Sequence, residues 1–258
     1  MNWVEPGSVN VVIGYHFLGL GHLDSFARAP CVFYQLEQLS VRQGWLTADR
    51  ERVLRAASEI WDYSEENVAF LRAKGFTNVS HLPLGYHPAL RGIGHLREQE
   101  KDVDVLFYGA RNERRTVVLN QLRDRFRLRT LFGVYGQDRD EWIARSRVVL
   151  NIHFYEMKVS EQVRLSYLLN NECFVVSEES EGNAFAEGMV SGPHEALTDL
   201  CGCYLADPEA RKIVAARGLE LFRQRPMVRF LEPLAETLPH LLICEEPRCE
   251  EPREEIRA

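Results

Sequence analysis

Short apolar runs alternate along this chain with longer charged segments of helical periodicity, and this alternation limits the fold more than any other feature. The runs at residues 9–14, 31–36, 103–108 and 148–152 each end at a glycine or just before a glycine or polar residue. Strand-helix repeats that build a parallel sheet produce this pattern. We therefore predict an α/β fold built on parallel sheets.

The segment at residues 64–75 carries both the start and the stop signals of a helix. Ser64 can cap its amino end, and Glu65 and Glu66 suit the positive end of the helix dipole. Gly75 can adopt the left-handed conformation that follows a last turn. On similar grounds we expect strands at residues 59–63, 79–82, 127–134 and 173–176, and helices at 49–57, 139–146, 160–171, 193–206 and 209–223, with another helix that carries Val118, Leu122 and Phe126 on one face.

A change in composition divides the chain into two halves. The sequence becomes Gly-Tyr-His-Pro and then highly charged between residues 85 and 102, after which the strand and helix pattern starts again. The last fifteen residues contain six Glu and three Arg, a net charge of −3, with almost nothing apolar. We predict an N-terminal α/β domain at residues 1–90, a linker at 91–102, a C-terminal α/β domain at 103–243 and a disordered acidic tail at 244–258.

The overall charge argues against nucleic acid as the main partner. Among 258 residues, 31 Lys and Arg oppose 38 Asp and Glu, a net charge of −7, so an anionic ligand requires a local basic site. No run of about 18 apolar residues predicts a membrane span, and the start lacks a secretory signal. We expect a cytoplasmic protein with reduced cysteines; because Cys201 and Cys203 lack further ligands at zinc-site spacing, we predict no metal site.

A basic cluster follows the strand predicted at residues 103–108. Ligands of open parallel sheets lie beyond the carboxyl ends of the strands, so this position is informative. Gly109 permits close approach of a ligand to the backbone, and Arg111, Arg114 and Arg115 follow at the start of the next helix. A helix N-terminus and nearby guanidiniums both bind anions, which predicts a binding site at this turn. The alternative is that these arginines form the solvated face of a helix.

Polar side chains also follow the next strand of the C-terminal half. Asn151 and His153 alternate at its end, and Ser160 is a candidate N-cap for the following helix. Glu161 and Arg164 lie three residues apart on one helical face, where Arg164 can reach a diphosphate and Glu161 can accept ribose hydroxyls. Two alternatives stay open: His153 is structural, and the dipole alone favours Glu161 in a first turn.

Several of these segments together resemble one family of enzymes. Residues 148–156 and 160–178 look like the nucleotide-sugar-binding half of GT-B glycosyltransferases, with the CgeB-like, group-1-related branch as the closest resemblance. The resemblance covers residues 103–222 well and is looser before them. Agreement with the same pattern extends to residues 104–115, 187–205 and 207–218.

The resemblance implies a specific fold, reaction and division of labour. The fold would be GT-B, with two Rossmann-like parallel-sheet domains, here with a shortened N-terminal domain. A sugar would move from a nucleotide-diphosphate donor, bound by the C-terminal domain, to an acceptor presented by the N-terminal domain, without a metal or other cofactor. Arg111, Arg115, Lys158 and Arg164 are the positions that could stabilise the leaving diphosphate. The acceptor class stays open between a small molecule, a peptide and a glycan.

Two features of this sequence depart from the family pattern. The family's Arg-x-x-Glu, whose carboxylate binds ribose, is Arg164-x-x-Tyr167 here, and Glu161 or Glu178 is a candidate substitute. The N-terminal half is also short, so its acceptor site is either minimal or completed by another subunit of a homo-oligomer.

An inverting transferase also needs a general base near the acceptor hydroxyl. We predict His16, in the loop after the first strand, or Glu37, at the end of the second; His22 and Asp24 are further candidates, and a retaining enzyme needs none. Two rival functions use the same architecture: a nucleotide-sugar epimerase, and a degenerate transferase that acts as a nucleotide-binding or partner protein without turnover.

Overall fold

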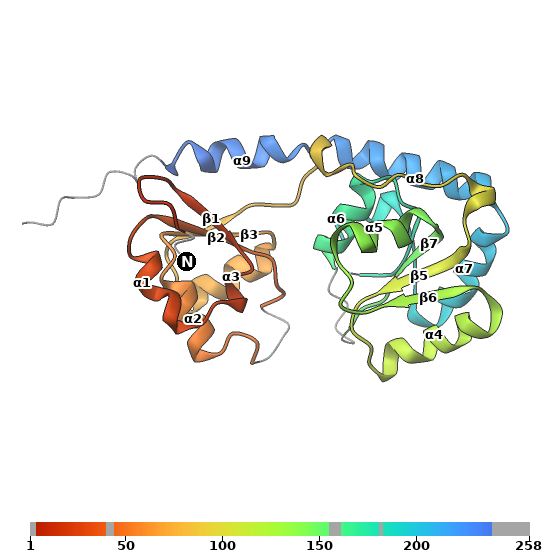
Figure 1. Ribbon diagram of the computed structural model, residues 1–258, viewed down its shortest axis with the longest axis horizontal. Coiled ribbons are helices and arrows are strands. Elements are labelled where there is room, and N and C mark those ends of the chain that lie inside the picture. Colours follow the sequence, from red (N-terminus) through yellow and green to blue (C-terminus); the bar gives the residue numbers. More distant parts are fainter. Residues whose placement is uncertain (1–3, 40–43, 155–160, 181–182, 239–258) are drawn as a thin grey trace, which may run out of the picture. The chain divides into compact units, whose positions relative to one another are not determined.

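The protein folds into two units (Figure 1). The N-terminal unit comprises residues up to Leu82 and those from Leu231 onward, and the C-terminal unit comprises Pro83–Phe230. Each contains a parallel sheet with helices, which confirms the predicted fold class. The structure, a computed structural model, describes residues 4–39, 44–154, 161–180 and 183–238.

The N-terminal unit is built on a parallel sheet with the strand order β1-β2-β3-β4. Each strand pairs with the next one in sequence, so every connection moves the chain one place along the sheet. The strands are β1 (Asn10–Ile13), β2 (Cys31–Gln35), β3 (Glu59–Asp62) and β4 (Val79–His81), and the helices are α1 (Leu23–Phe26), α2 (Ala48–Arg55) and α3 (Glu65–Ala73), with 3-10 turns at Tyr15–Phe17 and Leu20–His22.

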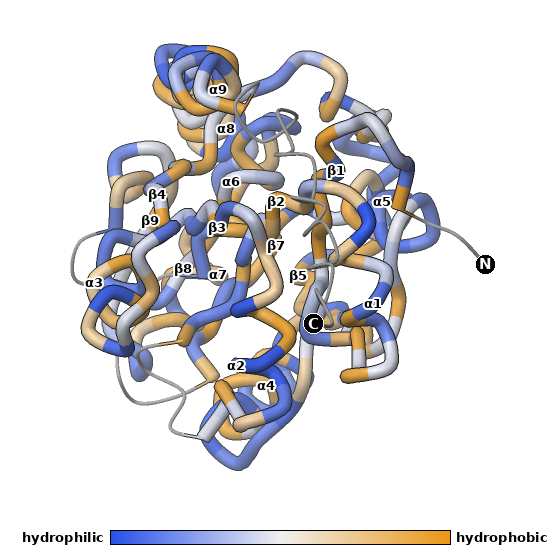
Figure 2. The backbone as a smooth tube through the Cα atoms, turned by 90° about the vertical axis from the view of Figure 1, so that its left-hand side faces the viewer, coloured by the Kyte–Doolittle hydropathy of each residue, from blue (hydrophilic) through white to orange (hydrophobic). Residues whose placement is uncertain are grey.

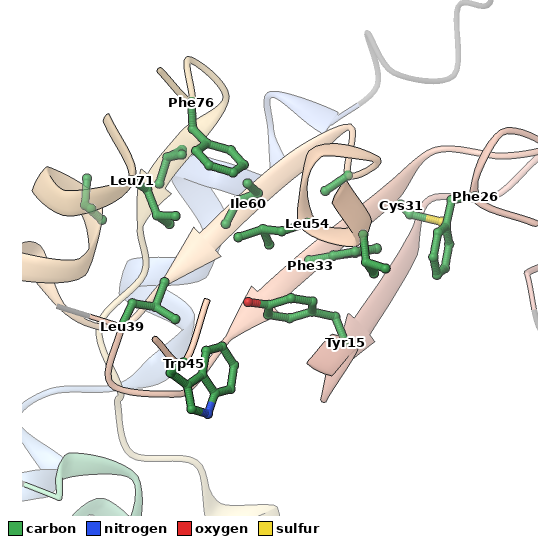
Figure 3. Packing of buried hydrophobic residues seen from close by; sticks show 14 of the residues in the cluster. Tyr15, Phe26, Cys31, Phe33, Leu39, Trp45, Leu54, Ile60, Leu71 and Phe76 are labelled. Carbon is green, nitrogen blue, oxygen red and sulfur yellow. The ribbon is translucent and has the colours of Figure 1, made fainter. Parts of the chain in front are cut away.

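The core of the N-terminal unit lies where helices pack on this sheet (Figure 3). This core includes Phe33 of β2, Leu54 of α2 and Leu71 of α3, all of which are fully buried. Tyr15 stacks on Phe33 with the ring centroids 5.7 Å apart. This stacking anchors the turn that follows β1, because Tyr15 belongs to that turn.

The C-terminal unit contains a parallel sheet with the order β6-β5-β7-β8-β9. The chain leaves β5 toward β6 on one side and then returns to β7 on the other side of β5, so the direction of winding reverses between β5 and β7. The strands are β5 (Val103–Tyr108), β6 (Leu128–Leu131), β7 (Ser146–Asn151), β8 (Val175–Glu178) and β9 (Val190–Gly192). The helices are α4 (Glu113–Arg125), α5 (Gly136–Ala144), α6 (Gln162–Asn170), α7 (Leu197–Leu205) and α8 (Pro208–Arg223), with 3-10 turns at Pro88–Leu90, Glu98–Glu100, Ala186–Gly188 and His194–Ala196.

Both faces of this sheet are buried, as a doubly covered parallel sheet requires. Leu106 and Val149 belong to a cluster with residues of α5, α6 and α8, whereas Val105 and Val148 belong to a cluster with residues of α4 and α7. Successive strand residues face opposite sides, so this division follows from the apolar runs. Hydrophobic residues accordingly occupy the middle of both strands, at residues 105–107 of β5 and 148–150 of β7 (Figure 2).

Some elements differ from the sequence-based expectations. β9 and the helix α9 (Met227–Ala235) were not expected, and β6 is shorter than the strand expected at 127–134. Residues 91–102, the predicted linker, lie within the C-terminal unit by the division above, and the predicted tail at 244–258 lies outside the described residues. No helix among the described residues has both the length and the apolar character needed to cross a membrane.

Candidate functional site

The candidate site lies at the carboxyl ends of β5 and β7, where the direction of winding reverses. Open α/β sheets bind ligands at this topological switch point. The two strands are hydrogen-bonded neighbours, so the turns that follow them begin side by side. Asn112 sets the start of α4, because its Oδ1 accepts a hydrogen bond of 2.9 Å from the backbone N–H of Arg115.

Arg115 donates hydrogen bonds to the backbone of both turns. Its Nε donates to the carbonyl oxygen of Ile152 at 2.9 Å, and its Nη1 donates to that of Ala110 at 2.8 Å. Its Nη2 makes an ion pair with Glu161. The residue is only 2% exposed, and burial lowers its pKa while Glu161 opposes that shift. Arg115 therefore holds the site's backbone in place, with its donors already engaged.

Arg164, in the first turn of α6, contacts the same carboxylate, Glu161. Its Nη1 lies 2.8 Å from Asn151 Oδ1 and 2.5 Å from Glu161 Oε2, and its guanidinium lies 4.9 Å from the centroid of the Tyr108 ring. Its Nε is buried without a hydrogen-bond partner among the described residues. Buried polar groups normally have partners, so this unused donor marks a place for an acceptor group.

Gly109 makes room for Arg164. Its φ of 136° lies in a region that side-chain-bearing residues rarely adopt, and a Cβ there would come within 2.9 Å of Arg164 Nη2. We predict that Gly109→Ala destabilises the protein by about 1–3 kcal/mol and displaces the Arg164 guanidinium. Urea unfolding measures the first effect, and Gly133→Ala, at a positive φ with open space around it, is the matched control. Equal losses of stability in the two variants would contradict a specific role for the contact with Arg164.

Arg114 and Glu178 form a second ion pair at the adjoining strand end. Arg114 Nη1 lies 2.7 Å from Glu178 Oε2 and 3.2 Å from the carbonyl oxygen of His153. The backbone N–H of His153 donates to Glu178 Oε2 at 3.1 Å. Burial opposes ionisation of Glu178, but the hydrogen bonds from Arg114 and His153 outweigh it and lower the pKa of this carboxyl. Glu178 is therefore a buried carboxylate that fixes the turn after β7.

The imidazole of His153 is buried at the same edge. Its Nε2 lies 2.9 Å from Ser180 Oγ and 3.3 Å from the carbonyl oxygen of Glu179. Because a carbonyl oxygen only accepts, the contact with Glu179 is a hydrogen bond in the tautomer that has its proton on Nε2. Burial lowers the pKa of His153, opposed by the charge of Glu178, and the ring is neutral at neutral pH. Its Nδ1 has no hydrogen-bond partner in the described structure. In this tautomer Nδ1 is an unused acceptor, suited to a hydroxyl group.

The structure brings together most, but not all, of the predicted binding residues. Gly109, Arg115, Asn151, His153, Glu161 and Arg164 lie at one edge of the sheet in the contacts described above. Arg111 instead is exposed and hydrogen-bonds to Thr130 Oγ1 on β6. Lys158 and Ser160 lie outside the described residues.

Two contributors were not among the predicted binding residues. Arg114 was counted in the basic cluster without being selected, and Glu178 was noted only as a substitute ribose ligand. The hydrogen-bonded cluster contains three guanidiniums, of Arg114, Arg115 and Arg164, and two carboxylates, of Glu161 and Glu178. It therefore carries one positive charge in excess. An anion is therefore the ligand that the cluster favours electrostatically.

Two of the predicted base candidates, His16 and Glu37, follow the carboxyl ends of β1 and β2 in the N-terminal unit. His16 Nε2 and Glu37 Oε1 are 3.8 Å apart, close enough for an ion pair when the imidazole is protonated. His22 is engaged locally, with Nδ1 near the backbone N–H of Gly19 at 3.2 Å. Asp24 lies in the first turn of α1.

Two side-chain amides, both bonded to a buried carboxyl, hold the backbone of Glu37 in place. Asp62 accepts hydrogen bonds from Asn67 Nδ2 and Gln35 Nε2, both at 3.1 Å. The same two amide groups donate to the carbonyl oxygen of Glu37, at 2.7 and 2.6 Å respectively. The ends of β2 and β3 are thus joined by one polar network.

None of the described residues form a group of three or more His, Cys, Asp or Glu side chains that could hold a metal ion. The cysteines that the structure describes are free thiols: Cys31, Cys173 and Cys201 are buried and Cys203 is exposed.

Comparison with solved structures identifies the fold. Anabaena HepE, solved in complex with UDP and glucose, superposes with a TM-score of 0.60 and 16% identity over 90% of this chain and 78% of HepE. WaaG, a glycosyltransferase of lipopolysaccharide biosynthesis, superposes with a TM-score of 0.56 and 13% identity over 84% of this chain and 79% of WaaG. The chain has the GT-B fold. A UDP-forming α,α-trehalose-phosphate synthase from Burkholderia vietnamiensis gives a TM-score of 0.57 at 13% identity, over 89% of this chain and 70% of the synthase.

Sequence comparison gives less information. No family model matches the chain. Two uncharacterized proteins of Acanthamoeba polyphaga mimivirus, R358 and L140, are 28% and 29% identical to it over 137 and 133 residues. These matches cover 52% and 50% of this chain but only 46% and 43% of the relatives, so the chain spans about half the length of the proteins it matches.

Proposed function

We propose that the protein is a metal-independent glycosyltransferase that binds a nucleotide-diphosphate sugar at the carboxyl ends of β5 and β7. The observation that carries this proposal is the pair of unpartnered buried atoms, Arg164 Nε and His153 Nδ1, beside an excess of positive charge. An unused donor suits a phosphate oxygen, and an unused acceptor suits a hydroxyl group of a ribose or sugar. A nucleotide-diphosphate sugar carries both.

Each residue of the cluster has a distinct role in this proposal. Negative charge builds on the leaving diphosphate as its bond to the sugar breaks, and preorganised donors lower that barrier. Arg164 would contact the diphosphate directly, because it retains an unused N–H. Arg115 would act as a positioning residue, since backbone carbonyls and Glu161 occupy its donors. Lys158 would add a further cation.

Glu161 pairs with both arginines and is also the candidate ligand of the ribose. Its carboxylate contacts both Arg115 and Arg164, so it occupies the position where an anion would compete for the guanidiniums. In the complex we assign it, together with Ser160, to the ribose hydroxyls. Arg111, which is exposed at β6, would approach only the outer part of the donor.

The sugar would be transferred to an acceptor that the N-terminal unit binds. The acceptor hydroxyl attacks the anomeric carbon, the bond from that carbon to the diphosphate oxygen breaks, and the hydroxyl proton passes to a base. Glu37 and His16 remain the candidates for an inverting reaction, and their 3.8 Å separation lets one orient the other. A small molecule, a peptide or a glycan can each present such a hydroxyl, and another subunit of a homo-oligomer could complete this side.

The comparisons suggest which donor to test first. HepE was solved with UDP and glucose, and the trehalose-phosphate synthase is UDP-forming, so UDP-sugars have priority. We place the protein in the CgeB-like, group-1-related branch because of the residues at 148–178 that resemble it. We also assign it to the cytoplasm, where free thiols such as those of its described cysteines persist.

One observation favours a second function, nucleotide binding without transfer. Tyr167 stands where the family pattern has its ribose-binding carboxylate, and its hydroxyl donates to Asp140 Oδ2 at 2.6 Å. Burial and this hydrogen bond raise the pKa of Tyr167 to about 12, so the group stays neutral. A site without that carboxylate could retain the nucleotide and lose the reaction.

A thermal-shift and turnover experiment separates these functions. UDP at 100 times its dissociation constant adds about 2.7 kcal/mol, or roughly 5–10 °C in Tm for a chain of this size. We expect this shift, and release of UDP from a UDP-sugar in the presence of an acceptor mixture. A shift without UDP release from any sugar in a donor panel would support the binding function, and conversion of the sugar without an acceptor would indicate an epimerase. The absence of stabilisation by any nucleoside diphosphate would overturn both proposals.

A further inference from the structure

A cavity of about 440 Å³ lies at the edge of the C-terminal unit's sheet opposite to the arginine cluster. Ser146 at the start of β7 and Phe174 just before β8 both line it, which places it at the amino ends of these strands. Ile143 and Val149 supply apolar surface. The volume falls in the range of small-molecule sites, and the nucleotide site proposed above shares none of these residues.

Two carboxylates that line the cavity, Glu98 and Glu172, are already engaged with arginines. Glu98 Oε1 lies 2.8 Å from Arg147 Nε and 2.5 Å from Arg211 Nη2. Glu172 pairs with Arg91, which does not line the cavity, at 3.1 Å. Neither carboxylate is therefore free to neutralise another cation of the cavity.

Lys101 is such a cation. Its side chain is half-buried, and its ammonium has no hydrogen bond or ion pair among the described residues. Burial lowers the pKa of Lys101, and the charges of Arg211 and Arg147 lower it further. The negative charge of Glu98, which makes no ion pair with Lys101, opposes this shift. An ammonium that has lost water without gaining a counterion is unfavourable, and a bound anion would relieve this cost. Lys212 adds a second ammonium at the exposed rim, where Glu209 is also exposed.

The remaining polar groups of the cavity supply no negative charge. His95 Nε2 lies 2.7 Å from the carbonyl oxygen of Asn171, and burial lowers the pKa of this imidazole, so it is neutral at neutral pH. The Cys173 thiol is buried and burial raises its pKa, which keeps it protonated. The cavity thus combines apolar walls with an uncompensated ammonium.

We propose that this cavity binds a small oxyanion, a phosphate or a carboxylate, through Lys101 and Lys212. The ligand's apolar part would contact Ile143 and Val149. The occupied site would be a second ligand site of the C-terminal unit, separate from the nucleotide site and independent of the proposed transferase activity.

The small number of lysines makes this proposal directly testable. The chain contains four: Lys74, Lys101, Lys158 and Lys212. Reductive ¹³C-methylation keeps their charge and gives each a resolved NMR signal. We expect inorganic phosphate or benzoate to shift the Lys101 and Lys212 signals saturably, with a Kd of about 1 mM or lower. Lys74, exposed in the N-terminal unit, should not respond.

Two variants separate this cavity from the nucleotide site. In Lys101→Met, with Lys212 as reporter, the Kd should rise about tenfold or more while the thermal unfolding curve shows that the protein is folded. Arg164→Met should leave the shifts intact. Saturation by phosphate alone, or by benzoate alone, identifies which oxyanion the cavity accepts. Linear shifts with both probes would refute the proposal without bearing on UDP binding. Shifts that disappear in Arg164→Met would refute it by showing that the oxyanion binds at the nucleotide site.

Discussion

Arg164→Met should weaken binding of UDP roughly 30- to 150-fold, because a charge-assisted contact to a phosphate contributes about 2–3 kcal/mol. The side chain is positioned for this contact by Asn151 at 2.8 Å and Glu161 at 2.5 Å, and it retains an unpartnered Nε. Methionine keeps much of the apolar stem and removes the charge. Isothermal titration calorimetry with UDP measures the effect on binding independently of any acceptor.

A stability measurement is needed beside this titration. Without Arg164, the Oδ1 of the fully buried Asn151 loses its donor, which costs about 1–3 kcal/mol in the free energy of unfolding. Arg123→Met is the matched control, because Arg123 is exposed on α4 and hydrogen-bonds only to Asn120 Oδ1, at 2.7 Å, among the described residues. If the two variants, both folded, bound UDP equally well, Arg164 would have no part in a diphosphate site.

Sequence periodicity predicted the sheets well because burial of both faces demands continuous apolar runs. β5 and β7 were both expected, and with them the edge where their polar successors meet. β9 was missed because it has only three residues, Val190–Gly192, one of which is a serine. A strand this short owes its conformation to pairing with β8 rather than to its own pattern.

The choice of arginines shows where local patterns stop being informative. Asn112 is the N-cap of α4, so Arg111 precedes the helix and turns to β6, whereas Arg114 and Arg115 lie in the first turn. The capping preference of asparagine could have set this register from sequence. By contrast, the contact of Glu161 with Arg115 joins residues 46 positions apart, and no local pattern encodes it.

The stability of the N-terminal unit should fall as the pH rises from 5 to 7, because of Asp62. Burial raises the pKa of this carboxyl from 3.8 to about 7, despite hydrogen bonds from the Ser64 N–H, Asn67 and Gln35. The native state therefore holds the proton more tightly than the unfolded state does. The corresponding stabilisation is fully present below pH 4 and is lost as the pH rises through 7.

The magnitude and sign can be isolated with Asp62→Asn. Each pH unit between the two pKa values changes the free energy of unfolding by about 1.36 kcal/mol, so wild type should lose roughly 2–3 kcal/mol relative to the variant between pH 5 and 7. Urea unfolding at the two pH values measures this difference. The lowered pKa values of His95 and His153 act in the opposite direction, but they are common to both proteins and cancel.

A direct titration of Asp62 tests the same prediction without the Asp62→Asn variant, whose new amide group has an unfavourable neighbour. The variant's amide would face Gln35 Nε2, a donor that cannot accept a hydrogen bond. The ¹³C signal of the Asp62 carboxyl in the wild-type protein should titrate with a midpoint near 7. A midpoint near 4 would mean that the three donors offset burial, and the amides that bond to the Glu37 carbonyl would then be oriented by a carboxylate at every physiological pH.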